Sequence, residues 1–154
     1  MAMKLAEALQ ERADLNRTIE QLKTRLSNVA LVQEGEEPVE NPTSLKAELD
    51  ACISRLIHLM TCINQTNSKT VVYDHYTLTE LIARKDALTL KLHIYRDVAY
   101  EGSRVSYRAR NTEIKLKSSF SIPEWQAEID QMSKELRQLN NQIQQCNWTT
   151  ELME

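Results

Sequence analysis

Apolar residues recur in steps of three and four near the start of the chain, which is the pattern of a helix that buries one narrow stripe. These positions are Leu5, Ala8, Leu15, Ile19, Leu22, Leu26 and Val29. The stretch around them contains neither Gly nor Pro and is rich in helix-forming residues. We therefore predict a helix over about 3–33, ended by Gly35 and Pro38.

A second helix is predicted where Asn41 precedes Pro42. Asn is a preferred N-cap, and Pro is favoured at the first helical position because its missing N–H costs no hydrogen bond there. The apolar series that follows extends this helix over about 42–66. Additional apolar residues widen its stripe: Ile53, Ile57 and Met60. The connection from the first helix is short, so we expect the two helices to lie antiparallel.

Two further helices are predicted from capping boxes at 77–80 and 121–124. In this motif a hydroxyl and a carboxylate three residues apart each satisfy a backbone N–H at the start of a helix. An apolar series with helical spacing follows each box. The predicted helices cover about 77–101 and 122–147.

The predicted fold class is mainly α: an antiparallel four-helix bundle, or coiled-coil-like helical hairpins, in a single domain spanning 1–154. Between the last two helices, apolar and polar residues alternate, which predicts a short extended segment over about 112–120 before the last helix. The other β-leaning stretch is 71–73, and we expect the two to pair.

The apolar stripes are narrow, with mainly two apolar positions in seven. A helix in a compact single-chain bundle usually has about three. We therefore expect the helices to complete their burial by associating, and the sequence predicts a homo-oligomer.

Composition and targeting signals narrow the class of protein. Of 154 residues only two are Gly and three Pro, which argues against collagen and turn-dense β sandwiches. The sequence has no long apolar run and does not start with the apolar core of a secretory signal. Three widely spaced cysteines, Cys52, Cys62 and Cys146, fit reduced thiols better than a disulfide framework. We expect a cytoplasmic protein without a membrane-spanning helix.

Two positions on the apolar stripes carry positive charge, Arg12 in the first predicted helix and Lys85 in the third. In an up-down-up-down bundle these helices run parallel, and the two residues lie at similar distances from the helix starts. Two unpaired cations in one dry layer cost several kcal/mol. The pair therefore needs carboxylates, solvent or a bound anion, and we favour carboxylates that help to fix the register.

The segment that precedes the last helix is basic. Its candidate interaction residues are Arg104, Tyr107, Arg108, Arg110, Lys115 and Lys117. Arginine beside an aromatic residue can contact phosphates and bases, so binding of nucleic acid or another anion is one interpretation. The net charge of -3 and the acidic stretch 34–40 argue against nucleic acid. We favour an electrostatic contact within the assembly.

No metal, cofactor or catalytic site is predicted. His58, His75 and His93 lie in separate segments without metal-ligand spacing. The sequence has no Gly-rich phosphate loop and no nucleophile elbow. We therefore expect a protein that is not an enzyme.

The C-terminal string contains Trp148 and Glu151. We expect Trp148 to fold back as an apolar lid beyond the last helix. Antiparallel packing would bring this tail to the start of the first helix, so both residues are candidates for a docking surface.

Several stretches, which together span nearly the whole chain, resemble a family of small bacterial proteins labelled septicolysin. They are 3–9, 11–16, 32–38, 77–88, 113–115 and 147–152. The resemblance implies a bacterial, mostly helical protein and provides no catalytic motif. The label suggests a membrane-active cytolysin, but the density of Arg and Lys over 104–122 is unfavourable on a lipid-facing surface.

The main prediction for function is an oligomeric structural or protein-interaction module with an unknown protein partner. The alternatives are a membrane-active protein, a nucleic-acid or anion binder, and an enzyme whose site is assembled from distant residues.

Overall fold

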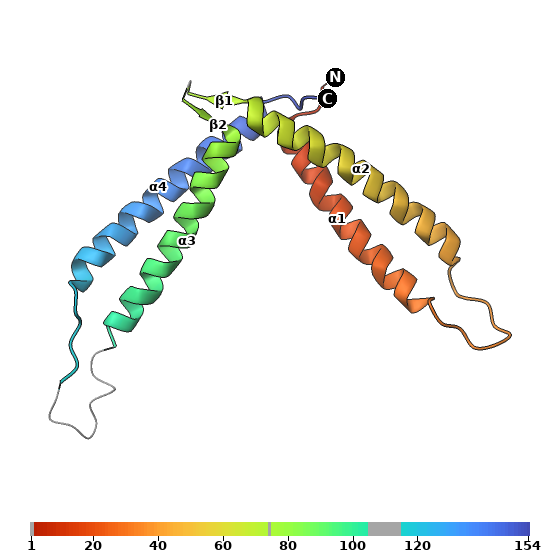
Figure 1. The fold of residues 1–154 in the computed structure, drawn as a ribbon, viewed down its shortest axis with the longest axis horizontal. Coiled ribbons are helices and arrows are strands. Elements are labelled where there is room, and N and C mark those ends of the chain that lie inside the picture. The colour runs from red at the N-terminus through yellow and green to blue at the C-terminus, as the bar shows by residue number, and fades with distance from the viewer. Residues whose placement is uncertain (1, 74, 105–114) are drawn as a thin grey trace. The chain divides into compact units, whose positions relative to one another are not determined.

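The computed structural model describes residues 2–73, 75–104 and 115–154. Its helices and strands are α1 (Leu5–Asn28), α2 (Pro42–Lys69), β1 (Val71–Val72), β2 (Tyr76–Thr77), α3 (Leu78–Gly102) and α4 (Ile122–Thr149). The predicted class, mainly α with four helices and a short β segment, is confirmed (Figure 1).

The helices begin where the sequence places their caps. The Asn41 side chain accepts a hydrogen bond from the backbone N–H of Thr43 at 2.9 Å. Thr77 Oγ1 accepts from the N–H of Glu80 at 3.2 Å, and the Ser121 hydroxyl accepts from the N–H of Glu124 at 3.3 Å. Each bond satisfies a backbone donor that has no partner within its helix.

The end of α1 differs from the prediction, because the helix stops at Asn28 instead of continuing to about residue 33. Val29, the C-cap, is the last buried apolar residue of the series, whereas Leu31 is 91% exposed. Further helical turns would bury no additional apolar surface, and most helical stability in proteins comes from such packing.

The strand pairing also differs from the prediction. Val71–Val72 pairs with Tyr76–Thr77 in a two-stranded sheet, not with the segment 112–120. Residues 115–120 form no strand, and 112–114 lie outside the described residues. A partner a few residues away needs a much shorter loop than one forty residues away, so its closure costs less entropy. Tyr73, in this connection, has a φ of 53°.

The chain divides into two compact units. Unit 1 comprises residues 1–72 and 146–154, and unit 2 comprises residues 73–145. The expectation that they form one domain stays a prediction.

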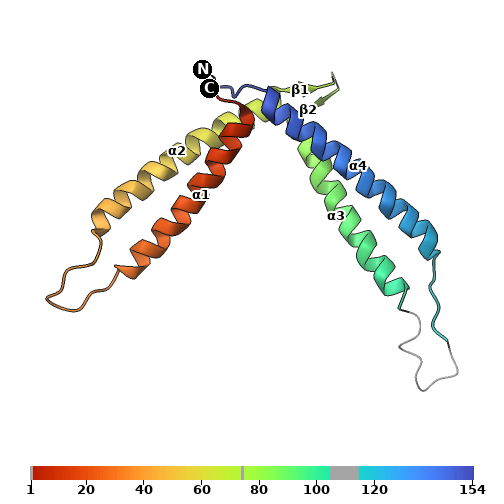
Figure 2. The same cartoon turned by 180° about the vertical axis from the view of Figure 1, so that it is seen from behind.

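In unit 1, α1 and α2 lie side by side (Figures 1 and 2). Leu22, Val29 and Leu45 form a buried cluster. Two ion pairs join the flanks of this hairpin. Arg55 donates to both carboxylate oxygens of Glu11, at 2.7 and 3.0 Å. Arg25 donates to Glu40 through Nε at 3.1 Å and through Nη2 at 2.5 Å.

The C-terminal tail docks at the start of α1, as the sequence predicts. The N–H of Leu5 donates to the carbonyl of Thr150 at 2.9 Å, and the N–H of Leu152 donates to the carbonyl of Met3 at 2.8 Å. The side chain of Leu152 is buried. The expected role of Trp148 is wrong, since this residue lies inside α4 and is 52% exposed. Leu152 takes the place of the expected apolar lid.

A buried hydroxyl also holds the tail. Thr66 is fully buried, and its Oγ1 donates to the carbonyl of Cys62 at 2.7 Å and accepts from the N–H of Met153 at 2.9 Å. The tail is therefore fixed by backbone hydrogen bonds to the N-terminal segment and by a side-chain hydrogen bond to α2.

In unit 2, α3 and α4 lie side by side (Figures 1 and 2). Their core consists of Leu92, Ala99, Ile129 and Met132, against which Leu88, Tyr95 and Leu136 pack. The Trp125 ring lies 5.0 Å from the Tyr95 ring and 4.3 Å from the Phe120 ring, measured between centroids. Large aromatic side chains therefore fill the end of this hairpin where α4 begins.

Across the described residues of both units, none of the helices combines the length and the apolar character that a bilayer span requires.

Candidate interaction surfaces

The two cations predicted to share a layer lie in different units, Arg12 in unit 1 and Lys85 in unit 2. Both side chains are partly buried. The ammonium of Lys85 lies 3.9 Å from the carboxylate of its neighbour Asp86. A shared layer stays a prediction, and Lys85 has a local carboxylate of the kind that we expected.

The basic segment is described only in part. Arg104 is exposed and forms an ion pair with Glu101 at 3.3 Å. Lys115 and Lys117 are exposed. Tyr107, Arg108 and Arg110 lie outside the described residues. A contact of this segment with an acidic partner or a nucleic acid stays a prediction.

Glu151 has a structural contact in unit 1. Its carboxylate lies 3.8 Å from the ammonium of Lys4, and the backbones of the two residues form an isolated β-bridge. This candidate therefore helps to attach the tail to the start of α1.

Within the described parts of the chain, no three His, Cys, Asp or Glu side chains come together in an arrangement suited to a metal ion. Cys52, Cys62 and Cys146 are free thiols. The sulfur of Cys62 lies 3.7 Å from Nε2 of His58.

An outward apolar stripe runs along α3. It consists of Leu90, Ile94 and Val98, which are 61%, 49% and 38% exposed. Four-residue spacing places them on one face of the helix. Sequence reasoning missed this stripe because it followed the stripe that packs against α4, and α3 carries two apolar series at once. The signal was present in the spacing of these three residues.

A comparable outward stripe occurs on α2 in unit 1. Ile53, Ile57 and Met60 are the residues that widen the predicted helix, and all three are exposed. Each unit therefore presents one helix with an apolar face that its own hairpin does not cover.

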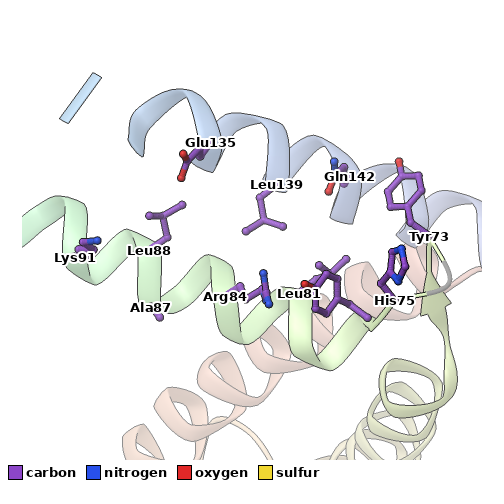
Figure 3. Close-up of a pocket in the computed structure, with 11 residues that line it drawn as sticks. Tyr73, His75, Leu81, Arg84, Ala87, Leu88, Lys91, Glu135, Leu139 and Gln142 are labelled. Atoms are coloured by element: carbon purple, nitrogen blue, oxygen red, sulfur yellow. The ribbon is translucent and has the colours of Figure 1, made fainter. Parts of the chain in front are cut away.

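A cavity of about 520 Å³ lies in unit 2 between α3, α4 and the segment around β2. It is lined by Tyr73, His75, Tyr76, Leu81, Arg84, Ala87, Leu88, Lys91, Glu135, Leu139 and Gln142. Figure 3 shows Leu88 of α3 and Leu139 of α4 pointing toward one another across it, with Tyr73 and His75 at one end and Lys91 and Glu135 at the other. Sequence reasoning missed this site, because its members come from three segments with no motif spacing.

Two cations border the cavity. The guanidinium carbon of Arg84 lies 4.0 Å from the centroid of the Tyr76 ring, which is cation–π distance. The ammonium of Lys91 lies 5.4 Å from the centroid of the Tyr95 ring. Neither cation forms an ion pair with a residue that the structure describes. Glu135, on the opposite helix, accepts a hydrogen bond from Gln131 at 3.2 Å.

Comparison with known proteins assigns the family. The model of a family of unknown function (DUF6847) matches residues 12–152. The chain belongs to this family. A crystal structure of "a functionally unknown conserved protein from Corynebacterium diphtheriae" is similar to this DUF6847 member, with 38% sequence identity and a TM-score of 0.92. The match covers 99% of this chain and 100% of that chain.

No curated protein matches the chain. The resemblance to a septicolysin-labelled family is wrong, because the family model that matches is DUF6847, the similar structure is of a functionally unknown protein, and neither bears that label. The cytolysin interpretation rested on the label and is withdrawn with it.

Proposed function

We propose that this DUF6847 protein is an interaction module that associates with a second copy of itself through the outward stripe of α3. The observation that supports this is the row of exposed Leu90, Ile94 and Val98 on a helix whose other side is already packed. Exposed apolar rows of this kind mark association sites in soluble proteins.

The charges beside the stripe favour a second copy as the occupant. Asp86 lies on one edge of the stripe and Lys91 on the other, five positions further along α3. In a parallel pair of α3 helices, this spacing places Asp86 of one copy beside Lys91 of the other, as flanking charges pair in coiled coils. The proposed contact is therefore a short two-stranded coiled coil.

The expected association is weak. Burying an apolar side chain completely contributes about 1.5–3 kcal/mol, so a half-exposed one contributes roughly 1 kcal/mol. Six such side chains from two copies contribute roughly 6 kcal/mol, and the loss of translational and rotational freedom opposes this gain. The net free energy of association is therefore modest, and association should depend on concentration. The stripe on α2 would add contact area if it joined the assembly.

Sedimentation velocity from about 10 μM to about 1 mM protein tests the proposal, since this range spans weak affinities. The wild type should pass from the mass of one chain to that of two. Ile94→Asp places a charge in the stripe and should remain monomeric throughout. Thr89→Asp introduces the same residue at an exposed position of α3 outside the stripe and should associate like the wild type.

A single-chain mass of 17.8 kDa for the wild type at every concentration contradicts the proposal. Association of Ile94→Asp equal to that of the wild type also contradicts it. Circular dichroism establishes that both variants keep their helices.

We further propose that the protein acts in the cytoplasm and without catalysis. The sequence supports this through its widely spaced cysteines and its lack of a catalytic motif. Fractionation of cells that express the full chain tests the location.

A further inference from the structure

We propose that the cavity between α3 and α4 binds a small organic anion with an apolar body. The acid group would lie at Arg84, and the body would lie between Leu88 and Leu139. This site does not include Leu90, Ile94 or Val98 of the stripe proposed for association, although Lys91 borders both, and its acid-binding residue Arg84 takes no part in that association.

The volume and the apolar lining of the cavity suit such a ligand. Its volume of about 520 Å³ lies within the range of small-molecule sites, which is about 300–1,000 Å³. Leu81, Leu88 and Leu139 line it, and Leu81 is buried. Between Leu81 and Lys91 the site follows α3 for about 15 Å, at about 1.5 Å per residue. A flat bicyclic ring or a short alkyl chain matches these dimensions.

The guanidinium of Arg84 is positioned to bind the acid group. The guanidinium carbon lies 4.0 Å from the centroid of the Tyr76 ring, which helps to hold the group in place, and its N–H groups donate no hydrogen bond to any residue that the structure describes. A carboxylate can accept two of these N–H groups at once, which is the strongest arrangement for this pair. Arg84 has no ion-pair partner among the described residues, so an incoming anion would displace no internal carboxylate.

Glu135 determines which end of the cavity can receive the acid group of the ligand. Its carboxylate lies at the end of the cavity where Figure 3 shows Lys91, away from Tyr73 and His75. A second negative charge at that end would be repelled by Glu135 and attracted by Lys91, so little net attraction remains there. Arg84 has no acidic neighbour of this kind among the lining residues. The acid group therefore belongs at Arg84.

The connection between β1 and β2 supports a binding role for this place. Tyr73 has a φ of 53°, a backbone conformation that is rare for a bulky residue. Such conformations occur in short hairpin turns and also cluster at ligand-binding sites. Here the conformation accompanies the placement of the Tyr73 ring on the cavity wall.

The test uses 2-naphthoate as the probe, with 2-naphthamide as the uncharged analogue and acetate as the acid without a body. Amide NMR spectra of the full chain are recorded during each titration. Saturable shifts should concentrate at the lining residues of α3 and α4 with 2-naphthoate. Binding of 2-naphthamide and of acetate should each be at least tenfold weaker, since a charge-assisted hydrogen bond and the apolar contact are lost in turn.

Variants assign the acid group to Arg84. Arg84→Gln should weaken 2-naphthoate binding at least tenfold, whereas Arg137→Gln, on α4 and outside the cavity, should leave it unchanged. Tyr76→Phe keeps the ring beneath the guanidinium and should retain binding. Circular dichroism of each variant verifies that its helices remain.

Three results would each overturn the proposal: equal binding of 2-naphthoate and 2-naphthamide, unchanged binding in Arg84→Gln, or shifts scattered over both units. Because Ile94→Asp leaves the cavity intact, that variant should bind the probe like the wild type. Failure of the self-association proposal is therefore distinguishable from failure of this one.

Discussion

The two helical hairpins follow the same heptad pattern but are packed differently. The backbones of α1 and α2 approach each other more closely than those of α3 and α4 do. The buried cluster between α1 and α2 consists of Leu and Val, and two ion pairs join its flanks. Between α3 and α4 lie Tyr95, Trp125 and Met132.

The difference teaches that the period of a stripe sets which residues face each other, whereas their size sets how far apart the backbones lie. Bulky side chains at one end of α3 and α4 hold the helices apart. Closer to β2, the smaller side chains of Leu88 and Leu139 face each other, and the same distance between the two helices leaves a cavity. Between α1 and α2, aliphatic side chains fill the interface and two ion pairs join its flanks.

The largest expected effect on stability comes from shortening a leucine in each of the two helix–helix interfaces. Leu22→Ala should lower the free energy of unfolding by about 2–5 kcal/mol, because Leu22 is fully buried in the close seam. Leu139→Ala should cost less, roughly 1 kcal/mol, because Leu139 is only partly buried and borders an existing cavity. Urea unfolding followed by circular dichroism measures both, and equal losses would contradict the comparison.

An intermediate effect is expected where the tail is anchored in unit 1. Thr66→Val keeps the shape of the side chain but leaves the N–H of Met153 without its acceptor. The expected loss of unfolding free energy is about 1–3 kcal/mol. The hydroxyl of Thr61 only donates to the carbonyl of Ile57 on an exposed face, so Thr61→Val should change stability little in the same urea experiment. A loss for Thr61→Val as large as that for Thr66→Val would argue against this anchor.

The smallest expected effect concerns the ion pair between Glu11 and Arg55. Hydrogen bonds donated by Arg55 hold the pKa of Glu11 below its usual value of 4.5. The charged carboxylate therefore stabilises the folded state above that value, and this contribution is lost as the pH falls through the lowered pKa. The side chains of Arg55 and Glu11 are 40% and 33% exposed, so solvent screening limits the contribution to about 1 kcal/mol or less.

Melting temperatures of the wild type and Glu11→Gln measure this effect. The variant should melt lower at pH 7, and the difference should shrink as the pH falls through the lowered pKa of Glu11. Glu135→Gln in the other hairpin removes no ion pair that the structure describes, and its difference from the wild type should not follow the same pH dependence. A Glu11→Gln difference that stays constant as the pH is lowered through the acid range would rule out the ion pair as its cause.

The sequence predicted the starts of the helices well because the caps are local. Asn41, Thr77 and Ser121 each satisfy a backbone donor two or three residues away, so their effect is readable without the fold. The end of α1 was predicted too late, because the exposure of Leu31 depends on what lies around it. The partner of β1 was misjudged because two short segments have little sequence signal to specify register.

The surfaces were harder to predict than the elements. The docking of the tail followed from antiparallel helices, but the choice of Leu152 over Trp148 as the buried residue depends on where α4 ends. The cavity could not be predicted, because residues such as Tyr76, Arg84 and Leu139 come together only through folding. Arg84 stands among ordinary helical residues in the sequence.

The segment around Met3 and the tail around Leu152 lie side by side in unit 1, so a short Gly-Ser linker could join them. If the chain were then cut in the turn at Gly35, the hydrogen bonds between these two segments would be kept, and the new termini would lie at the far end of the hairpin. Such a circular permutant would carry fusion partners or labels away from the tail, where they would not interfere with its docking.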